Sequence, residues 1–157
     1  LTDFKVERTE KGCIPMAFPA RTHSSYPAIG SNSGAVRPSS GYAFTFIQKQ
    51  VAALARQFSG TPNISDIHVP RPHRRRDLLM DAVFLDVLKH APAQAPDLFI
   101  TLAQALRGDE LARFMSGIAG PAIIGKIIYA MPKWLFLRSA FRVCLDALIV
   151  RLKGAIS

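Results

Sequence analysis

The residues from Tyr26 to Phe58 constrain the fold more than any other part of the chain. A short apolar run comes first, followed by a loop of glycines and other small residues that contains Pro38. After the loop, apolar residues recur at steps of three and four, at Phe44, Ile47, Val51, Leu54 and Phe58. These steps place the five residues on one face of a helix. The segment therefore predicts a strand, a loop and an amphipathic helix, in that order.

Small polar residues stand just before this predicted helix. Ser39 and Ser40 can accept hydrogen bonds from backbone N–H groups at a helix N-terminus, and Gly41 lets another group approach the main chain closely. The free N–H groups and the dipole of such a terminus suit a phosphate or the polar edge of a flavin. An ordinary capped turn is the alternative. Spacing alone favours that alternative, because glycine patterns without context have many false matches.

Three stretches of the chain share residues with one enzyme family. The first comprises Ile29-Gly30, Gly34 and Arg37-Pro38-Ser39-Ser40-Gly41-Tyr42. The second, upstream, comprises Glu7, Glu10, Gly12, Ile14, Pro15 and Met16. The third, downstream, comprises Arg75-Arg76-Asp77, Met80-Asp81, Val83-Phe84-Leu85, Val87-Leu88, Phe114-Met115-Ser116-Gly117 and Ala130-Met131-Pro132. The three stretches resemble parts of the FAD-dependent lycopene cyclases. The first resembles the family's flavin-contacting G…G…P-S/T-T/S-G-Y signature, the second its E…E…G-x-I/L-P-M segment, and the third its C-terminal helical region.

The resemblance implies a lycopene β-cyclase-like enzyme, an intramolecular lyase or isomerase of carotenoid biosynthesis. Such an enzyme closes the ends of linear lycopene, or a related linear carotenoid, into rings without net redox change. It uses reduced FAD, NADPH as the reductant and a carboxylic acid that protonates the polyene. This chemistry needs a dry site, because water would capture the carbocation.

The resemblance also implies which residues contact the flavin. They are Gly30, Pro38, Ser39, Ser40, Gly41 and Tyr42. No residue matches the family's catalytic acid, which lies upstream of the Ile-Pro-Met segment, so the catalytic residue is unknown. Ala17-Phe18-Pro19 stands where some members have glycines, which leaves the cyclase subtype open.

We expect an α+β fold that is mostly α-helical. A few short N-terminal strands, over residues 3–9, 13–18 and 27–30, should precede a helical C-terminal region. The resemblance implies a partial FAD/NAD(P)-binding, glutathione-reductase-like fold that lacks its N-terminal Rossmann half, because no G-x-G-x-x-G is present. We therefore expect a C-terminal fragment that is inactive alone. Residues 1–60 would complete the substrate-domain sheet and the return strand-loop-helix, and residues 61–157 would form a helical, membrane-proximal region.

The charge of the chain suggests an anionic, partly apolar partner. The net charge is +9 and 49% of the residues are hydrophobic. A basic cluster, Arg71 and His73 to Arg76, is either solvated and balanced by Asp77 and Asp81 or docked on lipid headgroups. Nucleic acid ranks last, because aromatic residues do not interleave with the arginines. We expect a peripheral position on the cytoplasmic side of a membrane.

The last predicted helix, residues 133–153, either lies in the membrane interface with its arginines toward the headgroups or is a core helix. Its charges argue against a membrane span. No metal site is expected, because the four histidines share no spacing with carboxylates or cysteines. Cys13 and Cys144 are expected to be reduced core thiols.

Two other functions remain open at this point. One is a different FAD-dependent enzyme, a monooxygenase or a geranylgeranyl reductase, which usually carries a Gly-Asp pair before the proline loop. Here Gly30 is followed by Ser31. The other is a basic, membrane-binding helical module without catalysis, which would leave the Pro38–Tyr42 turn without a role.

Overall fold

Helices are the only regular secondary structure among the described residues. The computed structural model describes residues 5–12, 16–18, 28–60 and 68–156, and side chains as far as residue 150. Along the chain these residues form η1 (Gly30–Ser33), α1 (Phe44–Gly60), α2 (Arg75–His90), η3 (Pro92–Gln94), α3 (Ala95–Ala105), α4 (Gly108–Met115), α5 (Pro121–Ala130) and α6 (Lys133–Ile156). The two η elements are short 3₁₀ helices.

The prediction of short N-terminal strands, and with it the partial glutathione-reductase-like fold, is wrong. No strand occurs in the part of the chain that the structure describes. Residues 5–12 are exposed throughout and have no neighbouring strand, and a strand needs such a neighbour to satisfy its backbone groups. Gly30 adopts φ +69°, a left-handed conformation, and opens η1 instead of ending a strand. Residues 13–15 and Pro27 lie outside the described residues.

The helix boundaries in the second half follow the sequence signals. Pro96 and Pro121 lie in the first turns of α3 and α5, where a missing N–H costs nothing. Met131 and Pro132 separate α5 from α6, because proline lacks the N–H that would continue the helix. Arg107 is the N-cap residue of α4. Here the Glu110 carboxylate accepts a hydrogen bond from the Arg107 N–H at 3.1 Å.

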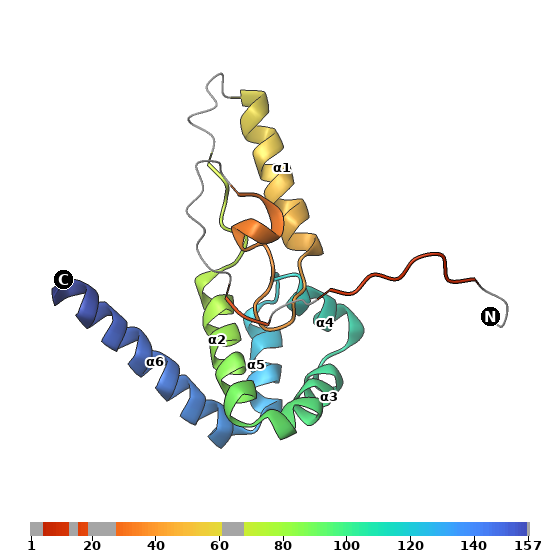
Figure 1. Cartoon of the computed structure of the whole chain (residues 1–157). Helices are drawn as coiled ribbons and strands as arrows, with labels where there is room; N and C mark the ends of the chain where they lie inside the picture. The colour runs from red at the N-terminus through yellow and green to blue at the C-terminus, as the bar shows by residue number, and fades with distance from the viewer. Residues whose placement is uncertain (1–4, 13–15, 19–27, 61–67, 157) are drawn as a thin grey trace.

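The core lies among α2, α3 and α5 and the connections between them. Figure 1 shows α2 and α5 at the centre of the molecule, α1 at one end and α6 leading outward to the C-terminus. Most of the buried apolar side chains form one cluster, made by Val87, Leu98, Leu106, Ala119, Ile123, Ile124, Ile127 and Met131. Phe84 and Phe136 pack against it from α2 and α6. This arrangement gives the functional site a rigid helical base.

Helix α1 buries a different face from the predicted one. Phe44, Val51 and Phe58 are exposed, at 65%, 50% and 60%, and of the five predicted positions only Leu54 is fully buried. Gln50 takes their place at the interior. Its side-chain oxygen accepts hydrogen bonds from the Gly30 N–H at 2.8 Å and the Ser33 hydroxyl at 3.0 Å. The polar anchor fixes η1 against α1 and turns the apolar stripe outward.

Helix α6 carries a long exposed apolar surface. Trp134, Leu137 and Phe141 are exposed at 80%, 64% and 70%. Within its first half the helix is fastened to α2 by Arg142, which donates two hydrogen bonds to the Asp86 carboxylate at 2.9 and 2.6 Å. Among the described residues, none of the helices is both long enough and apolar enough to cross a bilayer.

Candidate functional site

A closed turn precedes α1. The Arg37 N–H donates to the Tyr42 carbonyl at 2.8 Å, and the N–H groups of Ser40 and Gly41 donate to the Arg37 carbonyl at 3.2 and 2.8 Å. Gly41 has φ +70°, a conformation that residues with a side chain rarely adopt. The glycine is therefore required by the shape of the turn itself.

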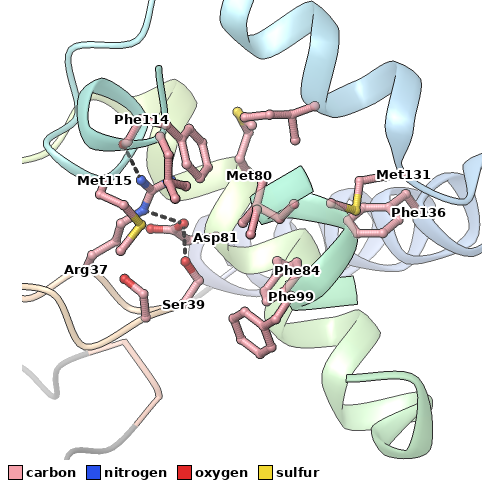
Figure 2. A pocket seen from close by; sticks show the side chains of 15 residues that line it. Arg37, Ser39, Met80, Asp81, Phe84, Phe99, Phe114, Met115, Met131 and Phe136 are labelled. Carbon is pink, nitrogen blue, oxygen red and sulfur yellow. Dashed lines mark hydrogen bonds and ion pairs between the residues drawn. The ribbon is translucent and has the colours of Figure 1, made fainter. Parts of the chain in front are cut away.

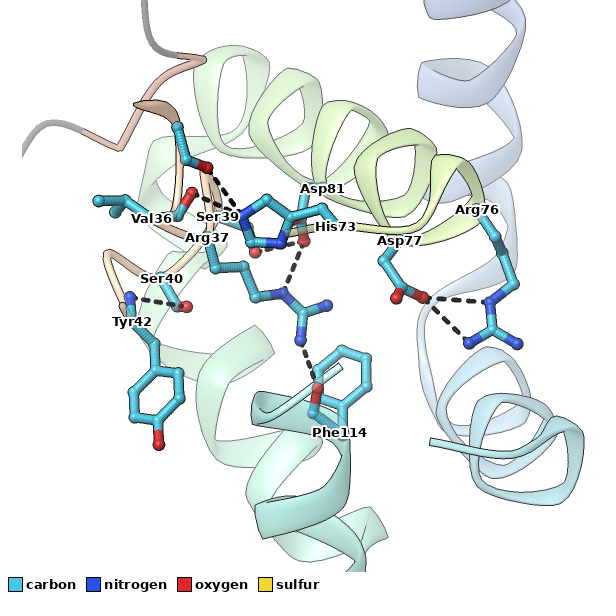
Figure 3. Close-up of polar contacts among 11 residues, drawn as sticks. Val36, Arg37, Ser39, Ser40, Tyr42, His73, Arg76, Asp77, Asp81 and Phe114 are labelled. Atoms are coloured by element: carbon cyan, nitrogen blue, oxygen red, sulfur yellow. Dashed lines mark hydrogen bonds and ion pairs between the residues drawn. The ribbon is translucent and has the colours of Figure 1, made fainter. Parts of the chain in front are cut away.

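A buried ion pair holds this turn against the helices. Arg37 Nε lies 3.1 Å from Asp81 Oδ1, and each side chain is 3% exposed. The Ser39 hydroxyl donates to the same oxygen at 2.6 Å. Arg37 also donates to the Phe114 carbonyl at 2.6 Å and stacks its guanidinium 4.1 Å from the centre of the Phe114 ring. As Figure 3 shows, these contacts join the turn to α2 and α4.

The ion pair lies at the edge of an apolar cavity. The cavity has a volume of about 300 Å³ and its lining is almost wholly apolar. Figure 2 shows Arg37, Ser39 and Asp81 at one side, with Met80, Phe84, Phe99 and Phe136 among the apolar residues around it. Asp81 Oδ2 is buried and has no hydrogen-bond partner, whereas Oδ1 has two. The cavity thus combines an apolar interior with one fixed polar edge.

His73 supports the same turn from the other side. Its Nε2 lies 3.0 Å from the Gly34 carbonyl and 3.2 Å from the Val36 carbonyl, so this nitrogen carries a hydrogen and donates it. The ring packs 4.2 Å from Phe46. Burial lowers the pKa of His73 below its usual value, although the two carbonyls and the Asp81 carboxylate favour the charged form. The neutral form of the His73 ring is therefore the one that supports the turn.

The structure brings five of the six predicted flavin-contacting residues into one turn. Pro38 and Ser39 are buried, Ser40 is exposed, and Gly41 and Tyr42 are half-buried. The sixth, Gly30, lies in η1 and its N–H donates to Gln50. Of the six, Ser39 and Ser40 line the cavity.

Two details of the predicted helix entry are wrong. Ser39 does not cap α1, because its hydroxyl donates to Asp81. Free N–H groups were expected at the helix entry, but those of Ser40 and Gly41 donate to the Arg37 carbonyl. The amides left for a ligand are those in the first turn of α1, which begins at Phe44.

The sequence interpretation missed the buried carboxylates of α2. Asp77 and Asp81 were expected to balance a surface basic cluster, but both are buried. Asp77 accepts hydrogen bonds from Arg76 at 3.0 and 3.1 Å, and Arg76 also donates to the Ala119 carbonyl at 3.1 Å. The available signal was two carboxylates one helical turn apart in a segment that is otherwise mostly apolar.

The described residues include one exposed thiol and no candidate metal site. No group of three or more His, Cys, Asp or Glu side chains in this part of the chain could hold a metal ion. Cys144 is an exposed free thiol and not the expected core thiol. Cys13 lies outside the described residues.

Comparison with known proteins identifies a family. Residues 1–138 match the family described as Lycopene cyclase protein, a range that includes the turn, α1 to α5 and the start of α6. No curated protein and no solved structure matches the chain. The family connects the chain with lycopene cyclase-related function in carotenoid biosynthesis and with a carotenoid substrate. Because the match covers most of the sequence, the chain belongs to the lycopene cyclase family.

Proposed function

We propose that this chain is part of a flavin-dependent lycopene cyclase. The enzyme closes the ends of a linear carotenoid into rings by acid-initiated, non-redox carbocation chemistry. The observation that carries the proposal is the apolar cavity beside the turn, because Ser39 and Ser40 belong to both. A hydrocarbon substrate offers no polar group and needs such a lining. The same lining excludes water, which would otherwise capture a carbocation.

The turn suits the polar edge of a reduced FAD. Ser40 is exposed, and the first turn of α1 offers amides that lack acceptors inside the helix. The surface over Gly30 is open, since an added Cβ would meet only Ile47 Cδ1, at 4.0 Å. In this proposal Ser40, Gly41 and Tyr42 contact the flavin, with Gly30 beside them. Bound reduced FAD, regenerated by NADPH, would supply an electron-rich surface next to developing positive charge.

The buried residues of the turn have a positioning role. Pro38 is fully buried, and Ser39 and Arg37 are fixed by Asp81. These contacts hold the exposed side of the turn in one geometry beside the cavity. The carboxylic acid that protonates the polyene is assigned to no residue of this chain.

The activity is tested by expressing the full-length gene in a host that accumulates lycopene. We expect cyclised carotenoids in the pigment extract. Unchanged lycopene in cells that contain abundant, flavin-loaded protein would contradict the proposal and favour another FAD-dependent enzyme.

The flavin contact needs a variant that does not strain the backbone. Gly41 is unsuitable, because any side chain at φ +70° strains the turn with or without a ligand. Ser40→Phe places bulk on the exposed side of the turn, and Ser59→Phe, at an exposed position near the end of α1, is the control. We expect only Ser40→Phe to lower the flavin bound per protein, at an unchanged Tm. Equal flavin occupancy in both variants would remove the assignment.

We also propose that the protein lies peripherally on the cytoplasmic side of a membrane, through the surface where α5 meets α6. Trp134, Leu137 and Phe141 are exposed there. The basic Lys133 directly precedes Trp134 in the sequence, and Arg138 directly follows Leu137. Trp and Lys at such a position suit the boundary between headgroups and acyl chains. Arg142 is excluded from this role, because it is paired with Asp86.

A further inference from the structure

A second apolar space lies on the surface between α2, α5 and α6. This groove has a volume of about 690 Å³ and an almost wholly apolar lining, to which Leu79, Val83, Ile128 and Leu137 contribute. Leu79, Ile128 and Leu137 are 51%, 62% and 64% exposed, so the groove is open to its surroundings. It is larger than the inner cavity and lies farther from the turn.

The groove and the inner cavity share a wall. Met80, Ile127, Met131 and Phe136 line both spaces, and Figure 2 shows three of them, Met80, Met131 and Phe136, around the inner one. Methionine side chains are unbranched and have three rotatable bonds, so Met80 and Met131 can move aside at low cost. Met80 and Met131 therefore contribute movable side chains to the wall between the two spaces.

We infer that the groove and the cavity together form the binding path of a linear isoprenoid hydrocarbon, which enters between α2, α5 and α6 and passes Met80 and Met131. The inference rests on the proposed function and specifies where its substrate lies. The Arg37–Asp81 pair closes the inner end, so one end of the hydrocarbon comes to rest beside the Pro38–Tyr42 turn.

The polar groups of the groove favour a hydrocarbon over an amphiphile. Lys133 and Tyr129 are its polar side chains, and they engage each other. Lys133 Nζ lies 4.8 Å from the centre of the Tyr129 ring and donates to the Tyr129 carbonyl at 3.3 Å. Both residues are exposed, which leaves the interior of the groove without a partner for a polar headgroup. The groove also includes Lys133 and Leu137, which belong to the proposed membrane surface, and a membrane is where such a hydrocarbon dissolves.

The test blocks the groove without disturbing the core. Gly125 lines the groove from within α5, and an added Cβ there would meet nothing within 4 Å. Gly125→Phe therefore fills open space, and the loss of a helix-interior glycine does not weaken the helix. Gly108→Phe is the matched control, because Gly108 lies in α4, has equally open space and lines neither cavity. Leu137→Trp, with exposed Leu148→Trp as its control, provides a second blocking variant.

Two measurements are made on the full-length protein. The first is lycopene retained per protein after purification of flavin-free protein, which cannot turn it over. The second is kcat/KM with flavin-loaded protein. We expect at least a tenfold loss of both in Gly125→Phe and Leu137→Trp, at unchanged Tm and flavin content, and no loss in either control.

Retention and turnover of lycopene at the parent level in both blocking variants would overturn the inference while leaving the proposed function intact. Lycopene binding that is lost in the blocking variants, in a protein that cyclises nothing, would support the path and overturn the proposed function. Oleate that displaces lycopene in the parent protein, but not in Lys133→Gln, would overturn the choice of a hydrocarbon and assign the groove to an amphiphile.

Discussion

Arg37 carries a permanent positive charge into the interior of the protein, where only its partners make the charge tolerable. A buried ion pair adds little net stability over apolar residues of the same volume, but removing one partner is costly. The pair with Asp81 therefore specifies a geometry more than it adds stability. That geometry is the one in which the turn stands beside the cavity.

Asp81→Ala should destabilise the protein by about 3–5 kcal/mol, because it leaves the Arg37 charge buried without a partner. The double variant Arg37→Met/Asp81→Leu should be less destabilised than Asp81→Ala, since no charge remains. Urea unfolding of the three proteins measures both differences. A double variant that is at least as unstable as Asp81→Ala would mean that the unpaired Arg37 charge is not what destabilises the single variant.

His73 should make stability depend on pH. The unfolded chain takes up a proton near the ordinary His value of 6.5, and the folded ring does so only at lower pH. The unfolded state binds more protons between these values, so stability falls as pH decreases through 6.5 toward the lowered pKa. His73→Gln should flatten this decrease in urea unfolding at a series of pH values, and His68→Gln, which removes an exposed ring, should not. Parallel curves for parent and His73→Gln would contradict the expectation.

At the scale of elements, helix boundaries were predictable and packing faces were not. Pro96, Pro121 and Pro132 act through local backbone geometry, so the sequence alone places the starts of α3, α5 and α6. The buried face of α1 depends on Gln50, whose partners are Gly30, Ser33 and Pro70. No local pattern reveals such partners, and apolar periodicity favoured the wrong face.

Arg142 should be the residue that fastens α6 to α2. Arg142→Met should lower the free energy of unfolding by about 2 kcal/mol, because it removes charge-assisted hydrogen bonds to Asp86. Arg138→Met, at an exposed position on the same helix, should change it by less than about 0.5 kcal/mol. Thermal and urea unfolding compare the two variants with the parent. Equal losses of unfolding free energy in the two variants would contradict the assignment.

The Arg142 contribution should also decline in acid. Burial alone would raise the pKa of Asp86, but the hydrogen bonds from Arg142 and Ser139, together with the nearby positive charge, outweigh it and hold the pKa below its usual value. Because the unfolded chain protonates this carboxyl first, the stabilisation is present above its ordinary pKa and is lost as pH falls through the lowered one. The difference in the free energy of unfolding between the parent and Arg142→Met should therefore become smaller in acid, as urea unfolding at a series of pH values would measure.

At the scale of the whole molecule, the family was recognisable from the order of short motifs, but the architecture was not. Alternating residues before Gly12 predicted strands, yet a strand is defined by a neighbour that the sequence does not name. The turn could be located, because Gly41 and Pro38 impose its backbone. Its attachment to Asp81 and Phe114 could not, because those contacts span 42 to 77 residues of chain.

Membrane association should depend on the surface where α5 meets α6. Lys133→Gln/Arg138→Gln should reduce flotation with anionic liposomes by roughly 30-fold, since each charge near the surface contributes about 1 kcal/mol. Lys5→Gln/Lys11→Gln removes the same charge from the exposed N-terminal segment and is the control. If binding of the parent protein to liposomes depends on neither the salt concentration nor the charge of the lipids, the proposal is refuted.

The reach of Arg37 sets an order of events during synthesis. Its carbonyl partner at Phe114 is made 77 residues later, and its carboxylate partner on α2 44 residues later. Until the ribosome has released residue 114, the turn lacks the supports that give it its shape. A flavin bound there as proposed is therefore acquired after translation has passed α4, and a nascent chain stalled before that helix should emerge colourless.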